Sequence, residues 1–231
     1  MKIDRIALIG YLILCVVAIF ANFFELYGLK LFSKSMLIPV LFFYYIGNVK
    51  KVDFLSCTYL FFNFIGDSIG IFDFKDEIQY LIIPFFICNI LLIFIMLKRI
   101  EKFRPTVFNL ISMLIVSLFL GYLWHTVVDI FKFSEGLQVK IAIYGIALFL
   151  ISFLASYKII NKVTTSNLYL LLCAFCVLIS DVFYILYNFQ AKLLIFDSIH
   201  FSCQIFSYLF FVNSIINREK LSYIINDNSH N

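Results

Sequence analysis

Long apolar runs alternate with short polar breaks along the whole chain. Eight runs are long enough, or nearly so, to cross about 30 Å of hydrocarbon as helices. They cover residues 6–24, 35–47, 54–72, 78–97, 106–125, 139–157, 168–187 and 196–216, and the second is the shortest. The breaks hold charged and turn-forming residues. This pattern predicts an all-α polytopic membrane protein with eight transmembrane helices.

The composition agrees with this class. Of the 231 residues, 63% are hydrophobic and 14% are charged, whereas soluble domains are about half apolar and about a quarter charged. We expect one transmembrane domain over residues 1–217 and a short polar cytoplasmic tail over 218–231. Lys2 and Arg5 precede the first run as in a signal peptide, but the run is too long for one and we expect it to be retained as a helix.

Basic residues predict the orientation. The N-tail, the second, fourth and sixth breaks and the C-tail hold 12 Lys and Arg, and the other breaks hold 6. Both termini are therefore predicted to lie in the cytoplasm, which requires an even number of spans. The modest net charge of +4 comes without a basic stripe carrying interleaved aromatics, so we expect no nucleic acid partner.

Two acidic residues, Asp67 and Asp181, lie inside apolar runs. A charge at the centre of a membrane helix costs roughly 3 kcal/mol, so we expect these residues to have a function. Each lies 13 positions after the start of its run, and both runs are predicted to point the same way. The two carboxyl groups are thus predicted at matched depth, about 20 Å from the cytoplasmic side, facing one shared cavity.

A second spacing repeats along the chain. Asn89 follows Asp67 by 22 positions, and Gln204 follows Asp181 by 23. The chain therefore resembles two four-helix halves, each with Asp on its third helix and an amide on its fourth, as after a parallel duplication. The two amides are interpreted either as interhelical hydrogen-bonding groups or as groups that orient a substrate or a water molecule.

Polar residues also share helix faces with the aspartates. Asn63 and Gly70 share a face with Asp67, Tyr184 and Asn188 share one with Asp181, and a further polar face holds His200, Gln204, Ser207 and Tyr208. Because polar groups facing lipid would be unsatisfied, these faces are predicted to point inward. A carboxyl group that keeps its proton in such a site is a general acid, and an ionised neighbour can stabilise a cation or activate water.

Other chemistry is poorly supported. The six cysteines all lie in apolar runs, including Cys173 and Cys176, and are predicted to pack as small hydrophobic residues. His125 and His200 do not form a paired metal-ligand motif. The chain has neither a serine elbow nor a P-loop. We therefore expect no metal and no cofactor.

At these residues the chain resembles the YhhN-like lysoplasmalogenase family of eight-helix membrane proteins. The resemblance extends over nearly the whole chain and rests on a few anchors: Lys34 at the head of the second helix, Gly66-Asp67, Tyr144, Ser180-Asp181 and Gln204. Two positions depart from the family. Ser35 stands where the family commonly has Pro after the Lys, and Asn89 stands where a His is expected.

The resemblance implies hydrolysis of the vinyl-ether bond of a lysoplasmalogen to a fatty aldehyde and a glycerophospho-base. Asp67 and Asp181 are then the catalytic residues, and the substrate-binding residues are Lys34, Asn89, Tyr144, Tyr184 and Gln204. The partners implied are a lysophospholipid substrate and membrane lipids, and the implied location is a bacterial inner membrane. Lys34 either reaches the membrane surface or contacts the lipid phosphate.

Two other functions remain open at this point. A small proton- or cation-coupled transporter would use the same aspartates as ion sites and needs a water path to both membrane faces. However, the chain shows no pair of helices broken by Gly or Pro, as such transporters often have. A non-catalytic lipid-binding membrane protein is favoured by Asn89 in place of His.

Overall fold

The computed structural model describes residues 3–70, 77–98, 106–130 and 135–228. Within these ranges every regular element is an α-helix, which confirms the predicted all-α class. The helices are α1 (Ile3–Phe23), α2 (Tyr27–Asn48), α3 (Phe54–Ile69), α4 (Glu77–Leu97), α5 (Val107–Ile130), α6 (Glu135–Asn161), α7 (Thr165–Phe189) and α8 (Leu194–Asn228). Each predicted apolar run falls on one of them.

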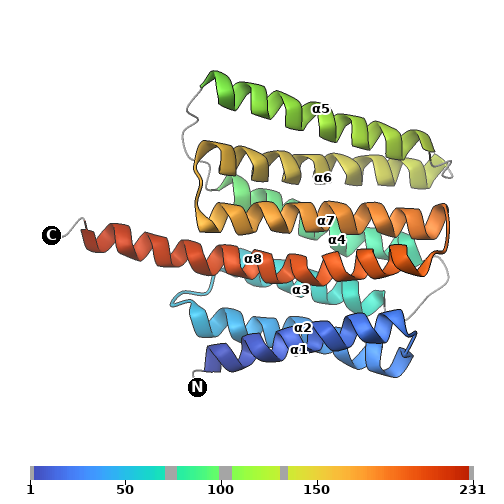
Figure 1. Ribbon diagram of the computed structural model, residues 1–231, viewed down its shortest axis with the longest axis horizontal. Helices are drawn as coiled ribbons and strands as arrows, with labels where there is room; N and C mark the ends of the chain where they lie inside the picture. Colours follow the sequence, from blue (N-terminus) through green and yellow to red (C-terminus); the bar gives the residue numbers. More distant parts are fainter. Residues whose placement is uncertain (1–2, 71–76, 99–105, 131–134, 229–231) are drawn as a thin grey trace.

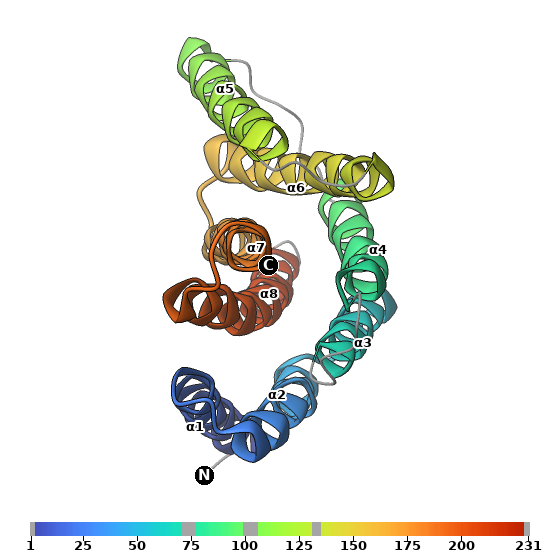
Figure 2. The ribbon, with the colours of Figure 1, turned by 90° about the vertical axis from the view of Figure 1, so that its right-hand side faces the viewer.

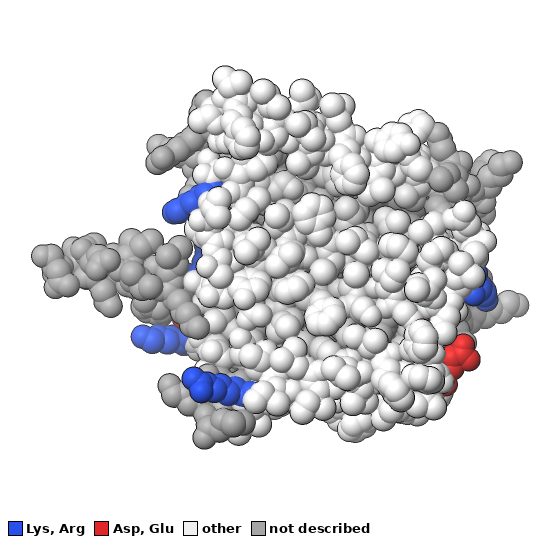
Figure 3. Space-filling view, viewed as in Figure 1, with Lys and Arg blue, Asp and Glu red and all other residues white. Residues whose placement is uncertain are grey.

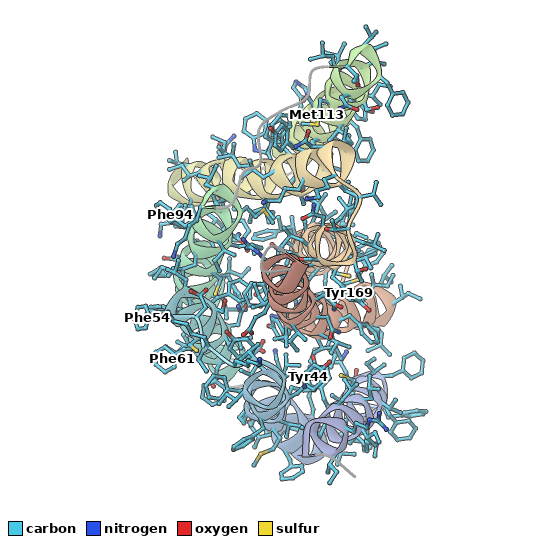
Figure 4. The ribbon with its side chains drawn as sticks, turned by 90° about the vertical axis from the view of Figure 1, so that its left-hand side faces the viewer. Tyr44, Phe54, Phe61, Phe94, Met113 and Tyr169 are labelled. Atoms are coloured by element: carbon cyan, nitrogen blue, oxygen red, sulfur yellow. The ribbon has the colours of Figure 1, made fainter. Side chains whose placement is uncertain are left out.

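Seven of the described helices are long and apolar enough to cross a membrane, and α3, with 16 residues, is shorter. Many large apolar side chains face outward; Phe54, Phe61 and Phe94 are examples that point away from the bundle in Figure 4. The face drawn in Figure 3 has a broad belt without Lys, Arg, Asp or Glu between two charged ends. The chain is a polytopic integral membrane protein.

Consecutive helices run in opposite directions, so that their links alternate between the two ends of the bundle (Figure 1). The start of α1 and the end of α8 lie toward the same end. Viewed along the helices, α1 to α4 form an arc that α6 and α5 continue, and α7 and α8 lie on its concave side (Figure 2). The central position of α8 follows from its packing against α1, α2 and α7.

The main apolar core lies between α8 and the first four helices. Phe211 and Ile205 of α8 are fully buried there, and the ring of Phe211 lies 4.1 Å from that of Tyr59 on α3. Hydrogen bonds fix the same interface, since Tyr44 on α2 donates to Asn213 Oδ1 at 2.9 Å. By contrast α5, which packs on α6, is the least buried of the described long apolar helices.

The two halves of the chain, α1–α4 and α5–α8, meet through related contacts. α4 packs on α6, and α8 packs on α2. Each of these contacts joins the fourth helix of one half to the second helix of the other. Within each half the third helix also packs on the fourth, α3 on α4 and α7 on α8.

Most helix ends differ from the predicted ones by a few residues, and three of the differences bear on the site or the tail. α2 begins at Tyr27, so Lys34 does not open the helix but lies 7 positions inside it. α3 ends at Ile69, where the backbone N–H of Gly70 caps the last turn. α8 continues as a helix to Asn228 through most of the predicted tail. Residues 229–231, Lys2 and the loop basic residues Lys75, Arg99, Lys102, Arg104 and Lys132 lie outside the described residues.

Candidate functional site

A cavity of about 410 Å³, here called the main cavity, lies inside the curve of helices. It is bordered by α2, α3, α4, α6, α7 and α8 and reaches the end of the bundle where α2 and α8 begin. Its polar lining comprises Tyr27, Lys30, Lys34, Tyr144, Asp181, Tyr184, Tyr187, Asn188, Lys192, Asp197, His200 and Gln204. Its apolar wall includes Leu81, Ile82, Phe85, Ile141 and Ile185. One cavity therefore offers both a polar and an apolar surface.

Asp67 lies behind the wall of the main cavity, near the end of α3. Lys34 Nζ is 3.5 Å from Asp67 Oδ1, and Gln204 Nε2 donates to the same oxygen at 3.0 Å. The side chains of Asp67 and Lys34 are only 2% and 8% exposed. A buried charge of this kind is stable only when it is paired and hydrogen-bonded. Lys34 and Gln204 thus compensate Asp67 and separate it from the main cavity.

Lys34 is held at the wall by more than the carboxylate. Its ammonium lies 5.4 Å from the centre of the Phe201 ring, in the range of a cation–π contact. Lys30, one turn earlier on α2, lies 5.7 Å from the same ring. Two cations of α2 therefore flank Phe201 at the polar side of the main cavity.

Gly66 allows a close approach of α3 and α4. A Cβ atom at this position would lie 2.8 Å from the ring of Phe85, which is too short for real contacts. Both residues line the main cavity. The packing of α3 against α4 therefore explains why a glycine precedes Asp67.

Asp181 occupies a different setting, on the wall of the main cavity itself. The hydroxyl of Tyr144 on α6 donates to Asp181 Oδ2 at 2.8 Å. Asn89 of α4 is buried and lies beside the Tyr144 hydroxyl, and among the described residues its Nδ2 has no hydrogen-bond partner. Here a neutral phenol takes the place that Lys34 has beside Asp67.

A second, apolar cavity of about 50 Å³, here called the side cavity, lies between α5, α6 and α7. Leu120, Trp124 and Leu148 line it. Tyr144 and Asp181, together with Ile141 and Ile185, line both the side cavity and the main cavity. The Asp181–Tyr144 pair therefore lies where the two cavities meet.

His200 is a cavity residue that the sequence placed on a polar face but not in the site. Its Nδ1 lies 2.9 Å from Ser180 Oγ and 3.0 Å from the Ser180 carbonyl oxygen. The ring also contacts Tyr184, with ring centres 4.9 Å apart. These contacts hold the ring through Nδ1 at the lining of the main cavity. The sequence could have indicated His200 as a site residue, because its partner Ser180 is next to Asp181 and His200 itself lies one helical turn before Gln204.

Of the residues predicted to form the site, Lys34, Tyr144, Asp181, Tyr184 and Gln204 line the main cavity. Asp67 contacts two of them from behind, and Asn89 lies behind Tyr144. In the described part of the chain, no three His, Cys, Asp or Glu side chains lie close enough to hold a metal ion. The arrangement is thus suited to acid–base chemistry and to binding of an amphiphile.

No protein-family model, curated protein or solved structure matches the chain.

Proposed function

We propose that the protein is an intramembrane lysoplasmalogenase-like hydrolase that cleaves the vinyl-ether bond of a lysoplasmalogen. The observation that carries this proposal is the position of the Asp181–Tyr144 pair at the meeting point of a polar cavity and an apolar cavity. In a lysoplasmalogen, the vinyl ether is the bond between the polar head and the hydrocarbon chain. A substrate bound across the two cavities would present this bond to Asp181.

The linings of the two cavities suit the two parts of such a substrate. Lys30, Lys34 and Lys192 bring cations to the main cavity, and Asp197 brings one carboxylate near its mouth. A phosphate favours the cations, and an amine or choline group favours the carboxylate. Leu120 and Leu148 of the side cavity suit the part of the alkyl chain next to the vinyl ether. Tyr184, His200 and Gln204 remain to hydrogen-bond the glycerol portion.

The chemistry needs a proton donor and water but no cofactor. Asp181, in its acid form, gives its proton to the second carbon of the vinyl ether, and an oxocarbenium ion forms next to the ether oxygen. The resulting carboxylate stabilises that cation. Water adds to the cation and returns a proton to Asp181. The hemiacetal then breaks its carbon–oxygen bond to the glycerol, and the hydroxyl proton moves to the leaving oxygen, which releases the aldehyde.

In this proposal Asp67 acts through other side chains. Its contacts with Lys34 and Gln204 hold both residues against the main cavity. Tyr144 orients Asp181 by donating to one carboxyl oxygen and leaves the other oxygen for the substrate. Asn89, beside Tyr144, occupies the helix on which the resemblance implies a His, and His200 supplies an imidazole to the cavity from α8 instead.

We further propose that all eight helices span a bacterial inner membrane, with both termini in the cytoplasm. The positions of the termini at one end of the bundle support an even number of crossings. Among the described residues, Arg5, Lys50, Lys51, Lys158 and Lys162 lie on loops or helix ends at that same end. The main cavity then opens on the side away from the cytoplasm. The matching contacts α4 with α6 and α8 with α2 support an origin of the two four-helix halves by duplication.

The test is aldehyde release by the purified chain in detergent. The substrates are choline and ethanolamine lysoplasmalogens, and the controls are an ester lysophospholipid and a saturated alkyl-ether analogue. Aldehyde from the vinyl ethers alone is the expected result. The absence of aldehyde from folded protein, in a parallel assay where a known lysoplasmalogenase is active, would refute the hydrolase and leave lipid binding or transport through the same cavity.

A further inference from the structure

A third cavity, here called the basic pocket, lies at the other end of the bundle from the mouth of the main cavity. Its volume is about 100 Å³, and it is formed where α6 ends, α7 begins and α8 passes. Such a volume is about that of three water molecules, and the largely polar lining suits one small polar group. It shares no lining residue with the main cavity.

Hydrogen bonds between the three helices give the basic pocket a fixed frame. Ser166 Oγ of α7 donates to the carbonyl oxygen of Ser214 on α8 at 2.8 Å, and Ser214 Oγ donates to the carbonyl oxygen of Ser166 at 2.9 Å. Asn167 Nδ2 donates to the carbonyl oxygens of Lys158 and Lys162 at 3.2 and 2.8 Å. The Asn167 amide thereby joins the first turn of α7 to the last turn of α6 and to Lys162, which follows it.

The charged side chains described on the lining of the basic pocket are all basic. Lys158, Lys162 and Arg218 line it, and no acidic side chain is among its described lining residues. Glu219, next to Arg218, accepts hydrogen bonds from the backbone N–H groups of Lys50 and Lys51 at 3.0 and 3.3 Å. α7 also begins here, with Thr164 as its N-cap, and the N-terminus of a helix favours an anion.

We propose that the basic pocket binds a phosphate group that carries net negative charge, either on an anionic lipid head group or as free phosphate. Lys158 lies in the last turn of α6, Lys162 follows directly after that helix, and Arg218 lies on α8, so that one phosphate would be held by residues of both helices. A guanidinium and ammonium groups are the usual partners of phosphate, and basic pockets between transmembrane helices bind anionic head groups. This site is independent of the proposed hydrolase activity.

The lipid source is tested by native mass spectrometry of the full chain in detergent, with phosphatidylglycerol and zwitterionic phosphatidylcholine as probes. We expect phosphatidylglycerol to be retained more tightly than phosphatidylcholine. The double variant Lys158→Gln with Arg218→Gln should lose about 30-fold in affinity for phosphatidylglycerol, because each cation near a membrane surface contributes about fivefold. The charge-preserving double variant Lys158→Arg with Arg218→Lys should retain the lipid, which shows that the pocket can still fold.

The matched control is Lys50→Gln with Lys51→Gln, which removes the same charge from two exposed residues at the same end of the bundle. The control should bind phosphatidylglycerol as the unmodified chain does. Equal losses in the two Gln variants would mean a general interfacial charge effect and would overturn the proposal.

Free phosphate is tested by thermal unfolding in inorganic phosphate and in chloride at equal ionic strength. A stabilisation specific to phosphate, absent in Lys158→Gln with Arg218→Gln, would assign the site to free phosphate and also support it. If neither phosphatidylglycerol nor phosphate distinguishes the unmodified chain from this variant, the basic pocket has no phosphate ligand. Aldehyde release plays no part in either readout, so its failure leaves this test intact.

Discussion

The surroundings of Asp67 and Asp181 have the same plan but different partners. Each aspartate lies on the third helix of its half, next to a donor from the second helix of that half: Lys34 beside Asp67 and Tyr144 beside Asp181. The fourth helix of the other half adds an amide, Gln204 bonded to Asp67 and Asn89 beside Tyr144. The two settings differ in the charge of the donor, in the group that the amide contacts and in the access to the main cavity.

In the proposed hydrolase, that difference separates the roles of the two carboxyl groups. Asp67 is buried against a cation, so its charge is already neutralised and it is removed from the substrate. Asp181 has a neutral donor and lies on the wall shared by two cavities. Under the proposed function, the two similar settings provide one positioning carboxylate and one reacting carboxyl group. The following predictions test this division.

The largest expected effect is on turnover when Asp181 is changed. Asp181→Asn removes the general acid and should lower aldehyde release about 1,000-fold, within the usual range for acid–base catalysis. Asp67→Asn should lower it only about tenfold, because it weakens a hydrogen bond to groups that hold the substrate. The comparison uses initial rates of variants with matched helical content. Equal losses in the two variants would show that the two carboxyl groups share one role.

The second effect is on stability and should be confined to Asp67. Asp67→Leu leaves the buried ammonium of Lys34 uncompensated and should destabilise the protein by about 3–5 kcal/mol. Adding Lys34→Met should recover most of that loss, because an apolar pair of similar volume replaces the ion pair. Thermal unfolding in detergent measures both. A double variant as unstable as Asp67→Leu alone would mean that Lys34 is not the group that Asp67 compensates.

The third effect concerns the neutral donor. Tyr144→Phe removes the 2.8 Å hydrogen bond to Asp181 Oδ2 while keeping the ring, and kcat should fall about tenfold with little change in stability. Tyr122→Phe, on the exposed surface of α5, is the matched control and should leave both kcat and stability unchanged. A loss confined to KM would assign Tyr144 to substrate binding alone.

The smallest effect is on substrate choice. Leu148 lines the side cavity, and Leu148→Phe should fill part of it. We expect kcat/KM for a long-chain lysoplasmalogen to fall about tenfold relative to a short-chain one, as pockets discriminate chains by one or more methylene groups. Leu150→Phe, an exposed position on the same helix, should leave the ratio unchanged. An unchanged ratio in both variants would place the alkyl chain outside the side cavity.

The elements and the two aspartates were predictable because their signals are local. Apolar runs marked every described helix, and the cost of a charge in hydrocarbon singled out Asp67 and Asp181. The helix ends were less predictable. The second apolar run was predicted to start at residue 35 with Lys34 at its head, but α2 begins at Tyr27 and the structure buries Lys34 beside Asp67.

The partner of each aspartate depends on tertiary packing and was beyond local signals. Lys34 and Tyr144 precede their aspartates by 33 and 37 positions, and nothing in their own helices indicates the pairing. The side cavity was not predictable from local signals either, because it lies between side chains of three different helices, α5, α6 and α7. The resemblance placed Tyr144 in the site, but not beside Asp181.

The central claim is that Asp181 protonates the vinyl ether at carbon, and an isotope experiment tests it most directly. Lysoplasmalogen is hydrolysed in D₂O, the aldehyde is reduced at once to its alcohol, and mass spectrometry locates the label. The account predicts one deuterium on the carbon next to the former aldehyde carbon for the unmodified chain, and almost no product with Asp181→Asn. Product without deuterium at that carbon, or labelled product released by Asp181→Asn at the unmodified rate, would contradict it.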